Sequence, residues 1–532
     1  MSDGFAYDVL EYPSHVHPQA HPSRLAAIAR LHGIDAASPR ACHLLEVGCG
    51  DGLQLLTLAM AYPQSRFVGV DLSQVAIARG EAIRRRLGLD NLRLVAADLM
   101  TWDPGPDAYD YIVAHGFFSW VPDAVRDRLL ALCRQVLSPA GIAYVSYNAL
   151  PGCHLRRLMW DMLRHHVRDL DDPRARITAA RDLLACLETD VAGSQVYGDA
   201  VRSEARDLLR RTETSVLFHD DLADTNQPFS ISEFAARADP HQLRYLGEAD
   251  YHEMSDAGLT DDARQRLAQR AAGDRLQREQ YLDYLKGRRF RQTLLCRADA
   301  PMQDVADAAM ARSLFAVGHL RTDDAEDGAL DLGAGVAARF HSGDGAMLTT
   351  DHPVIKAALA MVGNAFPAAL PFEAALAGAR DATRSQASLE DDANVLADTW
   401  VAAFGLGLLT LHCDPPMFAR QAGPKPKANA LARMQVEAGS DLVTSLRPSM
   451  IRIDSPLALE LVRLLDGQRD RERLLHDLAE RMAALPMEIE DTDGNGEGKA
   501  HSRDPAWWRE ALAGQLEAGL LQTARMGLLE AD

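Results

Sequence analysis

The sequence predicts a doubly wound α/β fold, in which helices cover both faces of a parallel sheet. Short apolar runs alternate with stretches of helical periodicity, a glycine-rich turn follows the first run, and the second and third runs each end in an aspartate. In open sheets of this kind, ligands bind at the carboxyl ends of the strands. We therefore expect a binding site where the glycine turn and the two aspartates meet.

The first predicted strand, CHLLEV (42–47), leads through the turn GCGDG (48–52) into a predicted helix, LQLLTLAMAY (53–62). Glycines in this turn allow the backbone to approach a ligand closely. The alternative is a strand–helix corner that binds nothing. Further strands are predicted at 66–73, 92–99, 109–120 and, after the turn LSPAG, 142–148, with helices between them.

Three carboxylates are expected around this turn. Glu46 belongs to the first strand, Asp71 ends the second and Asp98 ends the third. Asp71 follows the turn by about 20 residues, a spacing at which a carboxylate accepts both hydroxyls of a ribose. An acidic rim repels a pyrophosphate and attracts a cation. The sign of the charge therefore favours S-adenosylmethionine (SAM), a sulfonium nucleoside, over NAD.

Residues 43–148 resemble a class I SAM-dependent methyltransferase, with a Rossmann-like core, EVGCGDG as its first motif and the acids after strands two and three in order. The alternative is a degenerate fold without a ligand. By this resemblance, Glu46, Gly48, Cys49, Gly50 and Gly52 contact the methionine part of SAM, Asp71 and Leu72 the ribose, and Asp98 and Leu99 the adenine, with His115 near the methyl group.

The flanking segments extend the resemblance. YDVLEYPSHVHPQAHPSRLAAIARLHG, VAHGFFSWVP, SYNALPGCHLRRLMWDMLRHH and QYLDYLKGRRFRQTLLCR together are similar to bacterial methyltransferases that carry a methyltransferase regulatory domain. That group includes the rickettsial protein lysine methyltransferases that modify outer-membrane protein B. The resemblance implies a protein-lysine substrate, a homodimer and accessory domains, and it weakens from about residue 300 onward.

Three polar side chains are catalytic candidates because they lie at or just after predicted strand ends: His115, Tyr147 and Asn148. A lysine nucleophile must lose a proton, since its free pKa is about 10.4. Tyr147 and Asn148 would accept hydrogen bonds from the neutral amine, and His115 would act as a base. The alternative is that Tyr147 packs against the sheet and Asn148 caps the LPG turn.

The segment YPSHVHPQAHP brings His15, His17 and His21 close together in the sequence. We expect no metal site, because prolines interrupt the spacing and no carboxylate or thiol completes a ligand set. We expect instead a lid over the cofactor pocket, with Tyr12 closing on the methionine part. Trp120 is predicted to line the acceptor channel, with simple packing as the alternative.

The segment LFHDDLADTNQPF (217–229) contains His219 and Asp220. The resemblance places it near the catalytic face, where acids would attract a cationic lysine. The alternative is a solvated turn.

The chain divides into four predicted parts: a methyltransferase core at 1–255 with a helical insertion or dimer arm at about 152–212, a helical connector at 256–300, and winged-helix-like domains at 301–420 and 421–532. Each winged-helix-like unit contains three helices and then Gly-Leu-Leu leading into a strand. The basic run KGRRFRQ (286–292) is predicted to be a surface face, and EIEDTDGNGEGK (488–499) a disordered loop.

The charge balance argues against nucleic acid as a partner. The 56 Lys and Arg residues against 76 Asp and Glu residues give a net charge of −20. We expect no signal peptide, no membrane span and a cytoplasmic location, and the seven scattered cysteines suggest neither a disulfide scaffold nor zinc. The alternatives to a protein-lysine methyltransferase are a small-molecule methyltransferase and a SAM-binding regulatory protein without transfer activity.

Overall fold

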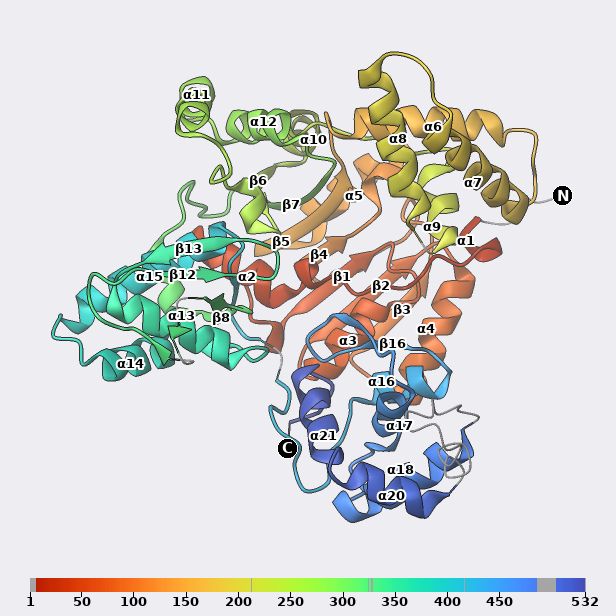
Figure 1. Cartoon of the computed structure of the whole chain (residues 1–532). Coiled ribbons are helices and arrows are strands. Elements are labelled where there is room, and N and C mark those ends of the chain that lie inside the picture. Colours follow the sequence, from red (N-terminus) through yellow and green to blue (C-terminus); the bar gives the residue numbers. More distant parts are fainter. Residues whose placement is uncertain are drawn as a thin grey trace.

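The computed structural model describes residues 6–485 and 504–531, apart from positions 212, 324, 327, 328 and 416. The loop predicted to be disordered, 488–499, lies outside the described residues. A seven-stranded sheet runs through the centre of the molecule, and smaller domains pack around it (Figure 1). Its strand order is β3-β2-β1-β4-β5-β7-β6.

The first five strands are parallel and follow the predicted order. Alternate residues of β4 point to opposite faces, so Tyr111 packs with the helices on one side and Ile112 with those on the other. The doubly wound fold is thereby confirmed. The elements are β1 (His43–Val47), α3 (Leu53–Ala61), β2 (Arg66–Asp71), α4 (Gln74–Leu87), β3 (Leu92–Ala96), β4 (Tyr109–Ala114), α5 (Asp123–Val136) and β5 (Leu137–Asn148).

The LSPAG segment, expected to be a turn, begins strand β5 instead. A register shift in the pairing of β4 with β5 between Tyr109 and Tyr111 accommodates the extra residues. A bulge of this kind allows a strand to contain Pro and Gly, which are unfavourable in a regular strand.

Two late strands complete the sheet. β6 (Leu243–Glu248) follows the insertion, and β7 (Phe290–Arg297), which was not among the predicted strands, lies antiparallel between β5 and β6. The methyltransferase sheet therefore extends beyond the predicted core boundary at 255 and into the segment 256–300 predicted to be a helical connector, because a strand of the sheet follows α11 (Asp261–Ala271) and α12 (Arg275–Lys286). Its strand partners are distant in sequence, so local periodicity does not reveal them.

The basic run 286–292, predicted to be a surface face, is exposed at Lys286 and Arg289 but buried at its other two arginines. Arg288 and Arg291 are only 6% and 1% exposed. Arg291 donates to Asp283 and Glu279 of α12, at 2.9 and 3.1 Å, and also pairs with Glu248 of β6. Buried charges need such partners. This ionic cluster fixes β7 to its neighbours.

The insertion is helical, as predicted, and has its own small core. It comprises α6 (Cys153–His166), α7 (Pro173–Thr189) and α8 (Gln195–Leu209), which lie beside α1 (Ala6–Val9) in Figure 1. A single π-helical turn, Leu217–Asp221, follows. Ser230 caps α10 (Ile231–Ala238) in a capping box with Glu233.

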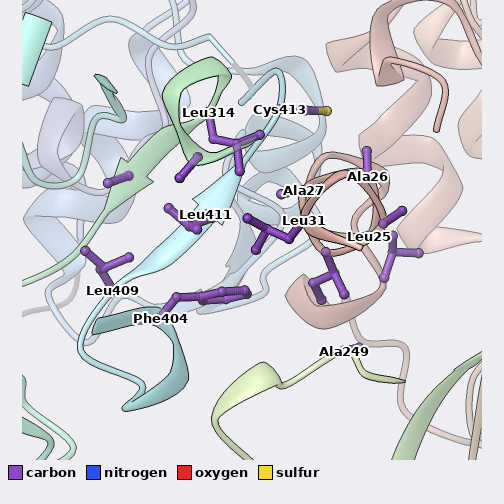
Figure 2. Packing of buried hydrophobic residues seen from close by; sticks show 14 of the residues in the cluster. Leu25, Ala26, Ala27, Leu31, Ala249, Leu314, Phe404, Leu409, Leu411 and Cys413 are labelled. Atoms are coloured by element: carbon purple, nitrogen blue, oxygen red, sulfur yellow. The ribbon is translucent and has the colours of Figure 1, made fainter. Parts of the chain in front are cut away.

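The middle domain packs against α2 (Pro22–Leu31). Figure 2 shows Leu31 of this helix on the side that faces Leu314, Phe404 and Leu411. From residue 353 onward the domain runs helix, strand, helix, helix, strand. Its interpretation as a winged helix stays a prediction. Its elements are β8 (Phe315–Val317), β9 (Arg321–Thr322), β12 (Ala338–His341), β13 (Met347–Thr350), α13 (Pro353–Ala365), β14 (Leu370–Pro371), α14 (Phe372–Thr383), α15 (Leu389–Gly405) and β15 (Thr410–His412).

The carboxyl-terminal domain departs from the predicted pattern at its end. Gly519 and the two leucines after it lie inside a helix rather than before a strand, because Leu516, Leu520 and Ala524 form one buried helical face. Leu431 packs against Val16 and Leu53 of the core. The elements are α16 (Ala430–Glu437), β16 (Leu442–Thr444), β17 (Met450–Arg452), α17 (Pro456–Leu464), α18 (Arg471–Ala484), α20 (Pro505–Ala513) and α21 (Leu516–Arg525).

Among the described residues, none of the helices combines the length and the apolar character that crossing a bilayer requires.

Candidate functional site

A cavity of about 690 Å³ lies at the carboxyl ends of the parallel strands, as expected for this fold. It is lined by residues from the core, the amino-terminal segment, the helical insertion and the start of β7. The cavity brings together most of the residues selected from the sequence: Tyr12, Glu46, Gly48, Cys49, Gly50, Asp71, Leu72, Asp98, Leu99, His115, Trp120, Asn148 and Asp220.

The glycine turn forms an open cradle on one wall of the cavity. Gly48 and Gly50 have φ values of +74° and +57°, a conformation that favours glycine. A Cβ on Gly48 would come within 2.7 Å of the Phe117 ring, whereas one on Gly50 would meet no atom within 4 Å. The space above Gly50 is therefore free for a ligand.

Asp71 holds the turn in shape. Its two carboxylate oxygens accept hydrogen bonds from the Gly50 and Ser73 backbone N–H groups, each at 2.8 Å. Burial raises the pKa of Asp71, and these hydrogen bonds counteract part of the effect. Each oxygen keeps a second lone pair, so Asp71 can also accept ribose hydroxyls.

Glu46 is a buried acid of the site. It is 5% exposed, and its Oε2 atom has no hydrogen-bond partner among the described residues. Burial, together with Asp51 and Asp71, raises the pKa of Glu46 to about 8. An unpaired buried carboxyl beside a cavity is costly unless a ligand completes it. Glu46 and the cradle thus fit a cationic nucleoside such as SAM.

The amino-terminal segment closes one side of the cavity. Ser14 donates to Asp51 at 2.6 Å, and the His17 backbone N–H donates to Gln54 at 2.8 Å. The His17 ring stacks on His115 with centroids 3.5 Å apart. Tyr7 and Tyr12 line the same side. The segment predicted to be a lid therefore packs against the cofactor end of the cavity.

The three nearby histidines have separate surroundings. His15 lies 3.4 Å from Glu213, His17 stacks on His115, and the buried His21 caps α2 by accepting from Ser23 N–H at 3.1 Å. Burial lowers the pKa of His17 to about 4 and that of His21 to about 3.

Another part of the cavity lining carries an amide pair and two acids, the partly buried Asp220 and the buried Asp221. Asn148 Nδ2 donates to Asn226 Oδ1 at 2.8 Å, and Asn226 Nδ2 donates to the backbone carbonyl of Asp220 at 2.7 Å. Burial and the neighbouring Asp221 raise the pKa of Asp220 to about 7, while a hydrogen bond from Tyr12 acts in the opposite direction. This part of the lining can hold a cationic or amine-bearing group.

Three predicted site residues do not line the cavity. Tyr147 is 0% exposed, packs between Phe118 and Phe234, and shares a 3.1 Å hydrogen bond with Thr293. Its predicted catalytic contact is wrong, because neighbouring strand residues face opposite sides of the sheet. Gly52 caps α3, where a Cβ would strike Leu94. His219 lies behind Tyr7, with its Nε2 atom 2.7 Å from the Leu10 carbonyl.

Several lining residues were missed. Phe290 lies opposite Asn148 in the register of β5 and β7, and its ring is 6.0 Å from that of His115. Only knowledge of the β7 pairing would have found it. Tyr7 and Phe117 lie near motifs selected from the sequence, but they carried no signal of their own. Arg211 lies at the end of the predicted insertion, about 60 residues after β5 in the sequence.

Comparison with known protein families gives three matches. Residues 44–141 match a methyltransferase domain, 213–297 a predicted methyltransferase regulatory domain, and 424–528 the PKMT C-terminal winged helix domain. The last match confirms the winged-helix interpretation of the carboxyl-terminal domain.

Two relatives come from Rickettsia prowazekii. The chain is 36% identical to the uncharacterised protein RP789 over 300 residues, which are 56% of this chain and 54% of that protein. The chain thus spans about half the length of this relative. It is 30% identical to the uncharacterised protein RP028 over 242 residues, which are 45% of this chain and 96% of that protein.

A solved structure matches nearly the whole chain. PKMT2 from Rickettsia typhi in complex with AdoHcy superimposes with a TM-score of 0.84 at 25% identity, covering 98% of this chain and 100% of that one. Together with the glycine cradle and the acidic cavity, these similarities identify the fold. The chain belongs to the family of class I SAM-dependent methyltransferases that combine a methyltransferase domain, a methyltransferase regulatory domain and a PKMT-type winged helix domain.

Proposed function

We propose that this protein is a SAM-dependent methyltransferase that transfers methyl groups to lysine side chains of a protein substrate. The observation that carries the proposal is that one cavity is lined both by an acidic nucleoside cradle and by an amine-compatible polar group of residues. The similarity to PKMT2 over almost its entire length supports a protein substrate.

The cofactor end would hold SAM through the chain's own acids. Asp71 accepts the ribose hydroxyls, Asp98 and Leu99 face the adenine, and Glu46 completes the methionine end. When bound, SAM supplies a methyl group on a cationic sulfur that departs as a neutral thioether. Positioning then removes much of the barrier to this displacement.

The orientation of the Asn148 amide favours an amine acceptor. The backbone carbonyl of Asp220 can only accept a hydrogen bond. Asn226 must therefore turn its NH₂ group toward this carbonyl and its side-chain oxygen toward Asn148. Asn148 therefore gives its NH₂ group to Asn226, and its Oδ1 atom remains as the acceptor. A lysine amine offers the N–H donor that this oxygen needs.

Asp220 and Asp221 are adjacent in the same π-helical turn. The Asp220 pKa of about 7 makes this residue able to receive an ammonium group and to exchange a proton near neutral pH. The acid attracts the protonated lysine, and Asn148 then holds the neutral amine. Trp120 lines the same cavity and would contact the aliphatic stem.

The test is transfer of radiolabelled methyl groups from SAM to the proteins of a heat-treated bacterial lysate by the full-length chain. Acid hydrolysis should release labelled methyl-lysines, and prior acetylation of the lysate's lysines should abolish the signal. Asp220→Asn should lower incorporation about tenfold or more, whereas Asp224→Asn in the same loop, whose side chain is exposed, should not. Label found only in small molecules would contradict the proposal.

We further propose a homodimer in the cytoplasm that binds neither nucleic acid nor membrane. The family resemblance supports the dimer, the net charge of −20 disfavours nucleic acid, and the seven free thiols suit a reducing compartment. Sedimentation and cell fractionation would test these points.

A further inference from the structure

A chain of three hydrogen bonds links His115 to Asp250, beyond the end of β6. His115 Nδ1 lies 2.8 Å from the Tyr144 hydroxyl, that hydroxyl lies 2.7 Å from Gln292 Oε1, and Gln292 Nε2 lies 2.9 Å from Asp250 Oδ2. Tyr144 belongs to β5 and Gln292 to β7. We call this chain of hydrogen bonds the His115 relay. It runs from the cavity across β5 and β7 to Asp250, which follows β6.

The chemistry of its far end fixes the direction of the relay. The Asp250 carboxylate, which also pairs with Arg24 at 3.1 Å, only accepts hydrogen bonds. Gln292 must therefore turn its NH₂ group toward Asp250 and its oxygen toward Tyr144. An amide oxygen only accepts, so Tyr144 donates its proton to Gln292.

The remaining contact then determines the tautomer of His115. The Tyr144 oxygen has given its proton away and can only accept from His115, so Nδ1 carries the imidazole proton. A neutral imidazole has one N–H, which leaves a lone pair on Nε2. Among the described residues Nε2 has no hydrogen-bond partner, and His115 lines the cavity.

His115 stays neutral in this position. Burial and the adjacent His17 and His15 lower the pKa of His115 well below its usual value, so the ring remains unprotonated at neutral pH. Without a second contact, either tautomer of a neutral ring would be available. The relay supplies that contact.

We propose that Gln292 and Asp250 are positioning residues that hold His115 in the tautomer whose Nε2 atom accepts a hydrogen bond from the acceptor amine. This inference rests on the proposed function and deepens it. Both residues belong to the segment 213–297 that matches the methyltransferase regulatory domain. These two residues do not line the cavity and thereby act on the site through hydrogen-bond direction alone.

The first test reads the tautomer directly. In protein labelled with ¹⁵N-histidine, the His115 resonances are assigned by their disappearance in His115→Asn. The wild type should show a protonated Nδ1 and an unprotonated Nε2. In Gln292→Met the Tyr144 hydroxyl is free to donate to Nδ1, and the pattern should reverse. An unchanged pattern in Gln292→Met would overturn the proposal, whether or not the protein methylates lysine.

The second test measures turnover with a library of lysine-containing peptides, with norleucine peptides as the blank. Gln292→Met should lower kcat about tenfold, with the Kd for SAM changed less than twofold. If Gln292 acts through His115, His115→Ala combined with Gln292→Met should be no slower than His115→Ala alone. Multiplicative losses would overturn the proposal. Wild type without lysine transfer would instead refute the proposed function.

A reciprocal exchange guards against a variant that merely folds poorly. Gln292→Glu alone places two carboxylates together and should be slow. In the double variant with Asp250→Asn, the new amide at position 250 donates to the new carboxylate at position 292. That carboxylate still accepts from the Tyr144 hydroxyl, so most of kcat should be recovered. No recovery would overturn the proposal. Gln386→Met is the matched control, since Gln386 is exposed and lies in the middle domain.

Discussion

The imidazole rings of His17 and His115 stack face to face at the wall of the cavity, with an interplanar angle of 24°. One ring comes from the amino-terminal segment and the other from the end of β4. Burial lowers the pKa of both, to about 4 for His17. The attachment of the amino-terminal segment therefore depends on two neutral imidazoles.

This stack should make stability depend on pH. The folded-state pKa of His17 is about 4 against 6.5 in the unfolded chain, so its stabilising contribution is complete above pH 6.5 and is lost as the pH falls toward 4. His17→Phe retains the stacking without the titration. Between pH 7 and 4.5 the variant should lose about 2 kcal/mol less stability than the wild type, which allows for partial exposure of the ring. If calorimetry shows the same dependence of Tm on pH for the wild type and for His17→Phe, the prediction is contradicted.

Asp71→Asn should weaken SAM binding while leaving the turn folded. An Asn side chain can still accept one of the two backbone hydrogen bonds, but it lacks the charge that strengthens bonds to ribose hydroxyls, and we expect a roughly 10- to 100-fold higher Kd by calorimetry. The control is Asp110→Asn. Asp110 also accepts a backbone N–H, from His43 at 2.9 Å, but it is near the amino end of β4. Equal effects in both variants would argue against a cofactor role.

Glu46→Gln should remove a pH dependence from SAM binding. A cationic ligand favours the ionised carboxylate, so binding lowers the pKa of Glu46 from about 8 and releases a proton. The wild-type affinity should therefore rise with pH and level off above about 8, whereas the variant should bind more weakly with a flatter profile. Calorimetry in buffers of different ionisation enthalpy measures the proton release. No release by the wild type would contradict the assignment.

Tyr147→Phe should have little effect on catalysis. The hydroxyl contacts Thr293 in the sheet interior rather than the cavity, so kcat should stay within about twofold while stability falls by about 1 kcal/mol. Turnover and urea unfolding of the same preparation check both values. A tenfold loss of kcat with unchanged stability would return Tyr147 to the list of catalytic candidates.

The sequence was sufficient where local pattern determines structure. Apolar strands, helical periodicity and the glycine turn predicted the five parallel strands, and Glu46, Asp71 and Asp98 line one cavity as expected. Strand geometry could have excluded one error, because Tyr147 and Asn148 are adjacent in β5 and cannot both face the same cavity.

The remaining features depend on contacts between distant segments. Gln292 and Phe290 reach the site only through the pairing of β7 with β5, which joins residues about 140 positions apart. Arg291 carries a charge that the sequence assigns to the surface, and only its acidic neighbours explain its burial. Local periodicity contains no information about either arrangement.

The position of β7 also constrains how the molecule is made. Until residues 290–297 leave the ribosome, one edge of β5 has no partner and Glu248 has no arginine to neutralise it. An open strand edge of this kind invites pairing with other chains. The nascent methyltransferase sheet is therefore exposed to misassembly during synthesis of the insertion and of both helices before β7, and fragments ending at residue 255 should aggregate rather than act as independent enzymes.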